Sequence, residues 1–256
     1  MCGERILKVS YSGGERGARE AARRGATVVV VDTFRASATI AVLVSLGARV
    51  RPVGSVAEAL AAEGDYKVGE RGGAKVRGFD FGNSPTEILG AGIVPGSTVV
   101  LTTTNGTRII RAATGSPRIL AGSFVNASAV AGALHPGDGE VAVIGCGWRG
   151  HRAAEDERAA GAIIARLVGK GAEPDQRARR VMRDYQERPI RALRRVSAAR
   201  RLLRLGYEKD LDLCLSEDTF PVVPMLLDGA FADPGGYRTI PGALSHNPGY
   251  CGQISS

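Results

Sequence analysis

A carboxylate and an arginine follow the most apolar run of the sequence. Asp32 comes directly after Val28–Val31, and Arg35 follows three residues later. A carboxylate where a buried strand emerges suits a metal ligand, a nucleophile or an acid–base group, and an arginine fork suits an oxyanion. The alternative is that Asp32 only caps the next helix. Phe34 stands where an Asp-x-Asp phosphatase would carry its second acid, so that class is not expected.

A glycine-rich loop over residues 69–84 carries further acids and cations. Its glycines let backbone N–H groups approach an oxyanion, and Glu70 and Asp80 could hold Mg²⁺. A solvated, flexible loop is the alternative. The candidate substrate contacts in this loop are Arg71, Gly72, Gly73, Lys75, Asn83 and Ser84.

Hydroxyl and amide side chains follow two further expected strands. The segment 101–108 opens a helix whose free N–H groups, with Arg108 nearby, form a ready phosphate site. Asn-Gly also makes ordinary turns, so Asn105 and Gly106 alone carry little weight. The segment 122–127 repeats the pattern. The candidates from the two loops are Thr104, Asn105, Arg108, Ser123 and Asn126.

The last polar loop, residues 145–156, offers two different chemistries. Cys146 and Arg152 have the Cys-x5-Arg spacing of cysteine-dependent phosphatases, which need a low-pKa thiolate in a phosphate cradle. So short a pattern often arises by chance, and we do not expect Cys146 to be the nucleophile. Glu155 and Asp156 begin the next helix, where they could bind metal or complement the helix dipole.

These motifs together resemble the ComB-type 2-phosphosulfolactate phosphatases in order and spacing. The resemblance rests on GERGG, GFDFGNSP, LTTTNGTR, SFVNA and the late Glu-Asp pair, and it runs from about Val28 to Gly161, with a fainter continuation over residues 206–214. It implies a three-layer α/β/α fold and Mg²⁺-dependent hydrolysis of 2-phospho-3-sulfolactate, a step towards coenzyme M. The family tends towards Cys-Ala-Gly and Phe-Ser-Leu where this chain has residues 145–147 and 152–154.

The resemblance and the residues lead to one assignment of roles. The substrate is a small, highly anionic phosphate ester, so its site needs fixed cations and a metal. Whether Asp32 forms an aspartyl-phosphate or water attacks directly stays open. We expect catalytic roles for Asp32, Arg35, Asn105 and Asp156, metal binding by Asp32, Glu70, Asp80 and Glu155, and substrate contacts from the loop residues named above.

The elements that position these loops alternate between short apolar runs and helical stretches. Strands are expected at 6–9, 27–31, 49–53, 66–69, 98–101, 118–121 and 141–144, most of them followed by a polar loop and a helix. Ser55 with Glu58 predicts a capping box, and Ser84 before Pro85 predicts another helix start. This alternation predicts an α/β fold with a mainly parallel, or mixed, sheet covered by helices on both faces. Reactive sites in such sheets lie beyond the carboxyl ends of the strands. The segment 220–256 gives no clear pattern.

Charge and composition limit the partners. The chain has 256 residues and a net charge of +8, and eleven arginines lie within residues 175–205. We expect one domain over residues 1–256 with an Arg-rich helical segment at about 175–215. The segment lacks interleaved aromatics, so nucleic acid is not expected as a partner. The rival function is a non-catalytic protein that holds an acidic partner on these helices.

Location and assembly follow from the same composition. No apolar run is long enough to span a membrane, and no signal peptide is visible. The four cysteines have no paired spacing, which is typical of reduced thiols in a cytoplasmic protein. A homodimer is left open.

Overall fold

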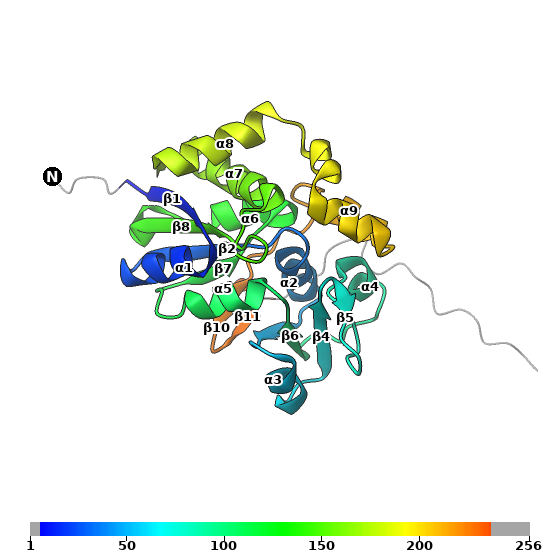
Figure 1. Ribbon diagram of the computed structural model, residues 1–256. Helices are drawn as coiled ribbons and strands as arrows, with labels where there is room; N and C mark the ends of the chain where they lie inside the picture. Colours follow the sequence, from blue (N-terminus) through cyan, green and yellow to red (C-terminus); the bar gives the residue numbers. More distant parts are fainter. Residues whose placement is uncertain (1–5, 237–256) are drawn as a thin grey trace, which may run out of the picture.

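One mixed β-sheet runs through residues 6–236, the part of the chain that this computed structural model describes (Figure 1). It has eleven strands in the order β5-β4-β6-β3-β11-β10-β7-β2-β8-β1-β9. The strands are β1 (Lys8–Gly13), β2 (Thr27–Val31), β3 (Arg49–Pro52), β4 (Tyr66–Arg71), β5 (Ala74–Lys75), β6 (Thr98–Thr102), β7 (Ile119–Ala121), β8 (Glu140–Gly145), β9 (Glu173–Pro174), β10 (Met225–Leu227) and β11 (Ala230–Ala232).

The sheet consists of two parallel halves joined by an antiparallel hairpin. One half pairs β4, β6 and β3, and the other pairs β7, β2, β8, β1 and β9. The hairpin β10–β11 lies between them, antiparallel to β7 and to β3. The expected mainly parallel, mixed sheet is confirmed.

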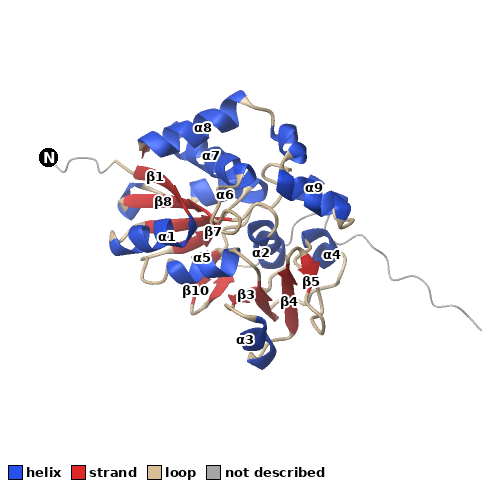
Figure 2. Ribbon diagram, viewed as in Figure 1, coloured by secondary structure: helices blue, strands red, loops and turns tan. Residues whose placement is uncertain are grey.

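Helices cover both faces of the sheet (Figure 2). Helices α1, α2 and α5 pack on one face, and α6, α7 and α8 pack on the other. The helices are α1 (Gly14–Arg23), α2 (Ala36–Ser45), α3 (Val56–Ala61), α4 (Pro85–Leu89), α5 (Gly106–Ala112), α6 (Ala127–Gly132), α7 (Ala154–Gly169), α8 (Gln176–Glu187), α9 (Ser197–Arg204) and α10 (Glu208–Cys214), with 3₁₀ turns η1 (Phe124–Asn126), η2 (Pro136–Asp138) and η3 (Ile190–Arg195).

The side chains of strand β2 alternate between two hydrophobic cores, one on each face of the sheet. Successive side chains of a strand point to opposite faces. Val28 and Val30 join the core under α1, α2 and α5, whereas Val29 and Val31 join the core under α6, α7 and α8. All residues of β2 are buried because both faces of the sheet are covered.

Local signals placed several helix starts correctly. The Ser55 and Ser84 hydroxyls accept hydrogen bonds from the backbone N–H groups of Glu58 and Glu87, at 3.0 and 3.2 Å. The Glu58 carboxylate accepts the N–H of Gly54 in return, which completes a variant of the expected capping box. Pro85 is the first residue of α4, as expected.

Two parts of the fold were not predicted. The amphipathic helix α1 was not assigned, and the hairpin β10–β11 lies in the segment that gave no pattern. The Arg-rich segment is helical, as predicted, and forms α8, η3, α9 and α10. No helix among residues 6–236 is long and apolar enough to cross a membrane.

The packing of α7 on α8 yields a stability prediction. A Cβ added at Gly161 would lie 2.2 Å from the Val181 carbonyl oxygen, a backbone atom that cannot move aside cheaply. We expect Gly161→Ala to lower the free energy of unfolding by about 1–3 kcal/mol in urea denaturation. Gly169→Ala, in the same helix, meets open space and should be neutral or slightly stabilising. Equal effects of the two substitutions would contradict this account.

Candidate active site

The acidic residues of the predicted site gather at the carboxyl edge of the parallel strands. Asp32 follows β2, Glu70 lies near the end of β4, and Glu155 and Asp156 lie in the first turn of α7, which follows β8. Asp32 is 9% exposed, Glu70 6%, Glu155 7% and Asp156 4%. These four residues are called the acid cluster below. They come from three separate stretches of the chain, and the sheet topology brings them together.

The acid cluster is electrostatically strained. Burial, with the neighbouring charge of Glu70, raises the pKa of Asp32 from its ordinary 3.8 to about 7. Burial also raises the pKa of Glu155, and burial with the charges of Asp32 and Glu155 raises that of Asp156. Within residues 6–236, no lysine, arginine or histidine forms an ion pair with any of the four. Such a cluster favours a proton or a cation.

Backbone N–H groups hold Asp156 across two loops. Its two carboxylate oxygens accept the N–H groups of Thr33 and Gly147, each at 2.8 Å. The Thr33 hydroxyl also donates to the carbonyl of Glu155 at 3.2 Å. These bonds fasten the loop after β2 to the start of α7, so Asp32 and the Glu155–Asp156 pair keep a fixed relation.

Glu70 ties the glycine-rich loop to the segment after β6. Its carboxylate accepts the N–H groups of Gly73 and Thr104, each at 2.7 Å. Gly72 and Gly73 both have positive φ, at 65° and 94°, which lets the chain turn back over Glu70. The Gly73 N–H therefore serves Glu70 of the same protein, and the contact of this loop's glycines with a substrate oxyanion stays a prediction.

The amino end of α5 approaches Asp32 closely. The N–H groups of Ala36 and Gly106 donate to the Asp32 carboxylate, which partly offsets the cost of burying it. A Cβ at position 106 would lie 3.1 Å from Asp32 Oδ2 and 3.0 Å from the Ala36 Cβ. Asn105, which precedes Gly106, caps α5 and is partly buried. The Asn-Gly pair is therefore placed beside Asp32 rather than in a remote turn.

Arg35 lies in a buried ion pair. Its guanidinium donates to Asp210 Oδ2 at 2.6 Å and to the Gly73 carbonyl at 2.8 Å, and it stacks 4.0 Å from the ring centroid of Tyr207. Asp210 is fully buried, and its other oxygen accepts bonds from Ser84 and Thr86. Arg35 and Ser84 therefore join the catalytic loops to α10. Asp210 was not singled out from the sequence, although the faint resemblance over residues 206–214 pointed to its segment.

Arg201 is the second residue that sequence reasoning missed. It comes from α9, and its guanidinium lies 3.7 Å from the ring centroid of Trp148. Burial lowers its pKa, while the charges of Glu70 and Glu155 act in the opposite direction. Its Nε is buried without a hydrogen-bond partner among the described residues. Arg201 thus brings a cation from the Arg-rich segment towards the acid cluster.

Some predicted residues lie apart from the acid cluster. Asp80 is exposed, and its carboxylate accepts the backbone N–H of Lys67 at 2.7 Å. Lys67 precedes Glu70 by three residues on β4, a separation of about 10 Å along a strand. Lys75 is exposed and donates to the carbonyl of Asp80. Arg108 is exposed and pairs with Glu15 of α1.

The remaining predicted contacts divide into two groups. The Asn126 carboxamide bonds to the backbone of Ser123, Ala121 and Val222, so it braces the turn after β7. The Arg71 guanidinium donates to the Thr102 hydroxyl at 3.0 Å. In contrast, Asn83 Oδ1, Thr104 Oγ1 and Ser123 Oγ are buried and have no hydrogen-bond partner within residues 6–236. Unmatched polar atoms of this kind are what a ligand or water would satisfy.

Cys146 does not have the setting of a nucleophilic thiol. Burial, together with the charges of Asp32 and Asp156, raises its pKa well above the ordinary value. Arg152 pairs with Glu157 instead of forming a phosphate cradle. The geometry agrees with the expectation that the Cys-x5-Arg spacing is accidental.

The acid cluster offers oxygen ligands for a metal ion but no complete cage within residues 6–236. Among residues 6–236, no three His, Cys, Asp or Glu side chains converge as a preformed metal cage. Mg²⁺ does not require one, because proteins usually hold it through one or two carboxylates, waters and substrate phosphate. Buried oxygen ligands with raised pKa values and no cationic partner fit that mode of binding.

The fold is that of an α/β enzyme, and the candidate site lies at the carboxyl edge of its parallel strands, where such folds place reactive groups. The chain belongs to the 2-phosphosulpholactate phosphatase family, whose model matches residues 15–229. The resemblance found in the sequence is thereby confirmed.

Several curated relatives carry the same name. A protein of Thermotoga petrophila, described as a probable 2-phosphosulfolactate phosphatase, is 40% identical over 212 residues, covering 80% of this chain and 91% of its own. Relatives with that description from Thermosynechococcus vestitus and Carboxydothermus hydrogenoformans are each 37% identical and cover 77% of this chain, and 87% and 84% of their own lengths.

The Arg35–Asp210 pair gives a test of what holds α10 to the site. Asp210→Ala leaves a buried guanidinium without its partner, so we expect the free energy of unfolding to fall by about 3–5 kcal/mol. Asp212→Ala, in the same helix, removes only an exposed pair with Arg194 and should cost under about 1 kcal/mol. Urea denaturation measures both. A small effect at Asp210 would show that the pair is dispensable.

The raised pKa of Asp32 predicts how the stability of the metal-free protein depends on pH. Because the folded-state pKa lies near 7 and the ordinary value is 3.8, protonation favours folding. Stability is therefore lost as pH rises from 5.5 through 7, by about 2 kcal/mol between pH 5.5 and pH 8. We expect Tm in chelator to fall by about 4–8 °C across this range. Asp32→Asn should remove most of that fall, and an unchanged slope in the variant would contradict the assignment.

Proposed function

We propose that this protein is a Mg²⁺-dependent phosphatase that hydrolyses 2-phospho-3-sulfolactate, or a closely related 2-phospho-hydroxy acid, to the hydroxy acid and phosphate. The observation that carries the proposal is the acid cluster: buried carboxylates that form no ion pair with a described residue, at the carboxyl edge of the parallel strands, in a chain of this family. The names of the relatives support the substrate class.

The chain supplies both signs of charge that such a reaction needs. Asp32, with Glu70 or the Glu155–Asp156 pair, would hold the metal, which when bound neutralises charge on the phosphate and promotes attack on phosphorus. Arg201 and Arg71 are the cations near this edge that could contact substrate oxygens. The Thr104 hydroxyl, which has no partner within residues 6–236, could donate to the same anion, whereas the unmatched Asn83 Oδ1 could accept from a hydroxyl or a water.

Arg35 takes a different role in this proposal from the one expected from sequence. Its guanidinium is only 2% exposed, and Asp210 and the Gly73 carbonyl hold it. It would therefore position the glycine-rich loop over Glu70 and act on turnover through that loop. Asp32 is central in either chemistry, as a ligand or as a group that exchanges a proton near neutral pH.

Phosphate release from 2-phospho acids tests the proposal. Activity should disappear in EDTA and return with Mg²⁺. Asp32→Asn should lower kcat by on the order of 10²–10⁴ while substrate still binds, because the lost interactions act chiefly in the transition state. Asp80→Asn is the matched control, since Asp80 lies apart from the acid cluster, and its kcat should stay near wild type.

The same assay distinguishes the proposed mechanism from the alternative mechanisms and functions. Full activity in chelator would overturn the metal requirement, and a silent Asp32→Asn would reduce Asp32 to a helix cap. Cys146→Ser should keep most of the activity, and its loss with an intact fold would revive the thiol mechanism. Salt-sensitive binding of acidic partners without any phosphate release would favour the non-catalytic binding protein.

A further inference from the structure

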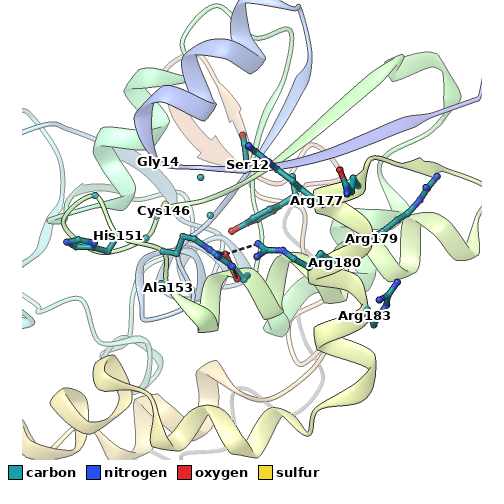
Figure 3. A pocket seen from close by; sticks show the side chains of 17 residues that line it. Ser12, Gly14, Cys146, His151, Ala153, Arg177, Arg179, Arg180 and Arg183 are labelled. Carbon is teal, nitrogen blue, oxygen red and sulfur yellow. Dashed lines mark hydrogen bonds and ion pairs between the residues drawn. The ribbon is translucent and has the colours of Figure 1, made fainter.

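A cavity of about 750 Å³ lies beside the acid cluster (Figure 3). Its floor is the carboxyl ends of β1 and β8, with Ser12, Gly13 and Gly145, and one wall is the loop that leads into α7. Helix α8 forms the opposite wall. None of the four residues of the acid cluster lines this cavity.

The lining is strongly cationic. Five arginines line the cavity against the single carboxylate of Glu157, although Arg179 extends away from Ser12 (Figure 3); they are Arg152, Arg177, Arg179, Arg180 and Arg183. Glu157 pairs with Arg152 and, at 3.4 Å, with Arg180. Arg177, Arg179 and Arg183 form no ion pair within residues 6–236. Elsewhere in the Arg-rich segment, Arg188 and Arg194 do find acidic partners.

Helix α8 carries four of these five arginines, and all four residues are exposed. Arg183 follows Arg179 by four positions and Arg180 by three, so the three lie on one side of the helix. The opposite face is anchored, because Ala178 and Val181 are buried in the core under α7. Three like charges on one face repel one another, and an anion between them would relieve that repulsion.

Neutral donors complete the cavity. The amino end of α1 begins at Gly14, and its cap residue Gly13 brings no side-chain acceptor to the first N–H groups. Ser12 and the Tyr11 hydroxyl also line the cavity. A neighbouring hollow of about 670 Å³ shares Arg177 and Arg179 but adds four acids, Glu20, Glu140, Glu173 and Asp175. Of these two cavities, only the first therefore has the lining of an anion site.

We propose that this arginine-lined cavity is a second ligand site, separate from the acid cluster, that binds a small multiply charged oxyanion such as a phosphate or polyphosphate group. The guanidinium forks suit phosphate oxygens, and the cavity is large enough for a small metabolite. It shares Gly145–Gly147 as a wall with the acid cluster, because Gly147 N–H donates to Asp156.

Calorimetric titration with inorganic pyrophosphate in EDTA at low salt tests the proposal. Without metal the acid cluster repels anions, so binding reports on the arginines. We expect one saturable site per chain. The triple variant Arg177→Ala/Arg179→Ala/Arg183→Ala should bind about a thousandfold more weakly, because each of the three lost charged hydrogen bonds is worth on the order of a tenfold change.

The control variant is Arg191→Ala/Arg195→Ala/Arg200→Ala, which removes the same charge from exposed positions outside the cavity. It should bind pyrophosphate nearly as wild type does. Absence of saturable binding, or equal losses in the two variants, would overturn the proposal. Displacement of pyrophosphate by inorganic phosphate and sulfolactate would identify the reaction's own anions as the occupants; a failure to displace would identify a separate effector. Because the titration needs no turnover, it stands apart from the test of the phosphatase activity.

Discussion

Four carboxylates are buried at one edge of the sheet, and the surrounding loops are arranged around them. Each is less than a tenth exposed, and none has a cationic partner within the described residues. Uncompensated burial of charge is costly, so the fold meets it with backbone donors: Thr33 and Gly147 for Asp156, and Gly73 and Thr104 for Glu70. Those bonds offset only part of the cost, and the pKa values of Asp32, Glu155 and Asp156 stay raised, so the cluster favours a proton or a cation.

The Arg-rich segment completes the active edge by folding back over it. Asp210 on α10 binds Arg35 from the loop after β2 and Ser84 from the loop before α4, so one buried carboxylate fixes two loops distant in sequence. Arg201 on α9 reaches the acid cluster and stacks on Trp148. The segment that looked like a solvated cationic surface is therefore partly an internal component of the site.

Local patterns predicted the elements whose signals are local. The β-branched run of β2 and the caps Ser55 and Ser84 were correct, because neighbouring residues decide them. The hairpin β10–β11 was missed because its strands are short and their place between β7 and β3 depends on distant partners. In the site, sequence found all four members of the acid cluster. It could not show that the Asp80 carboxylate accepts the Lys67 N–H, or which of the eleven arginines packs on Trp148. Tertiary contacts decide both.

The effect of the net charge of +8 depends on where the charged residues lie in the structure. An acidic active site alone would repel a polyanionic substrate during approach. Unpaired arginines of α8 stand beside that site, around a cavity that shares a wall with it, and Arg201 stands near the acids themselves. Fixed cations of this kind raise the local concentration of anions and speed their association. Under the proposed function, the arginines would attract the anion over a distance, and the buried carboxylates would act at contact.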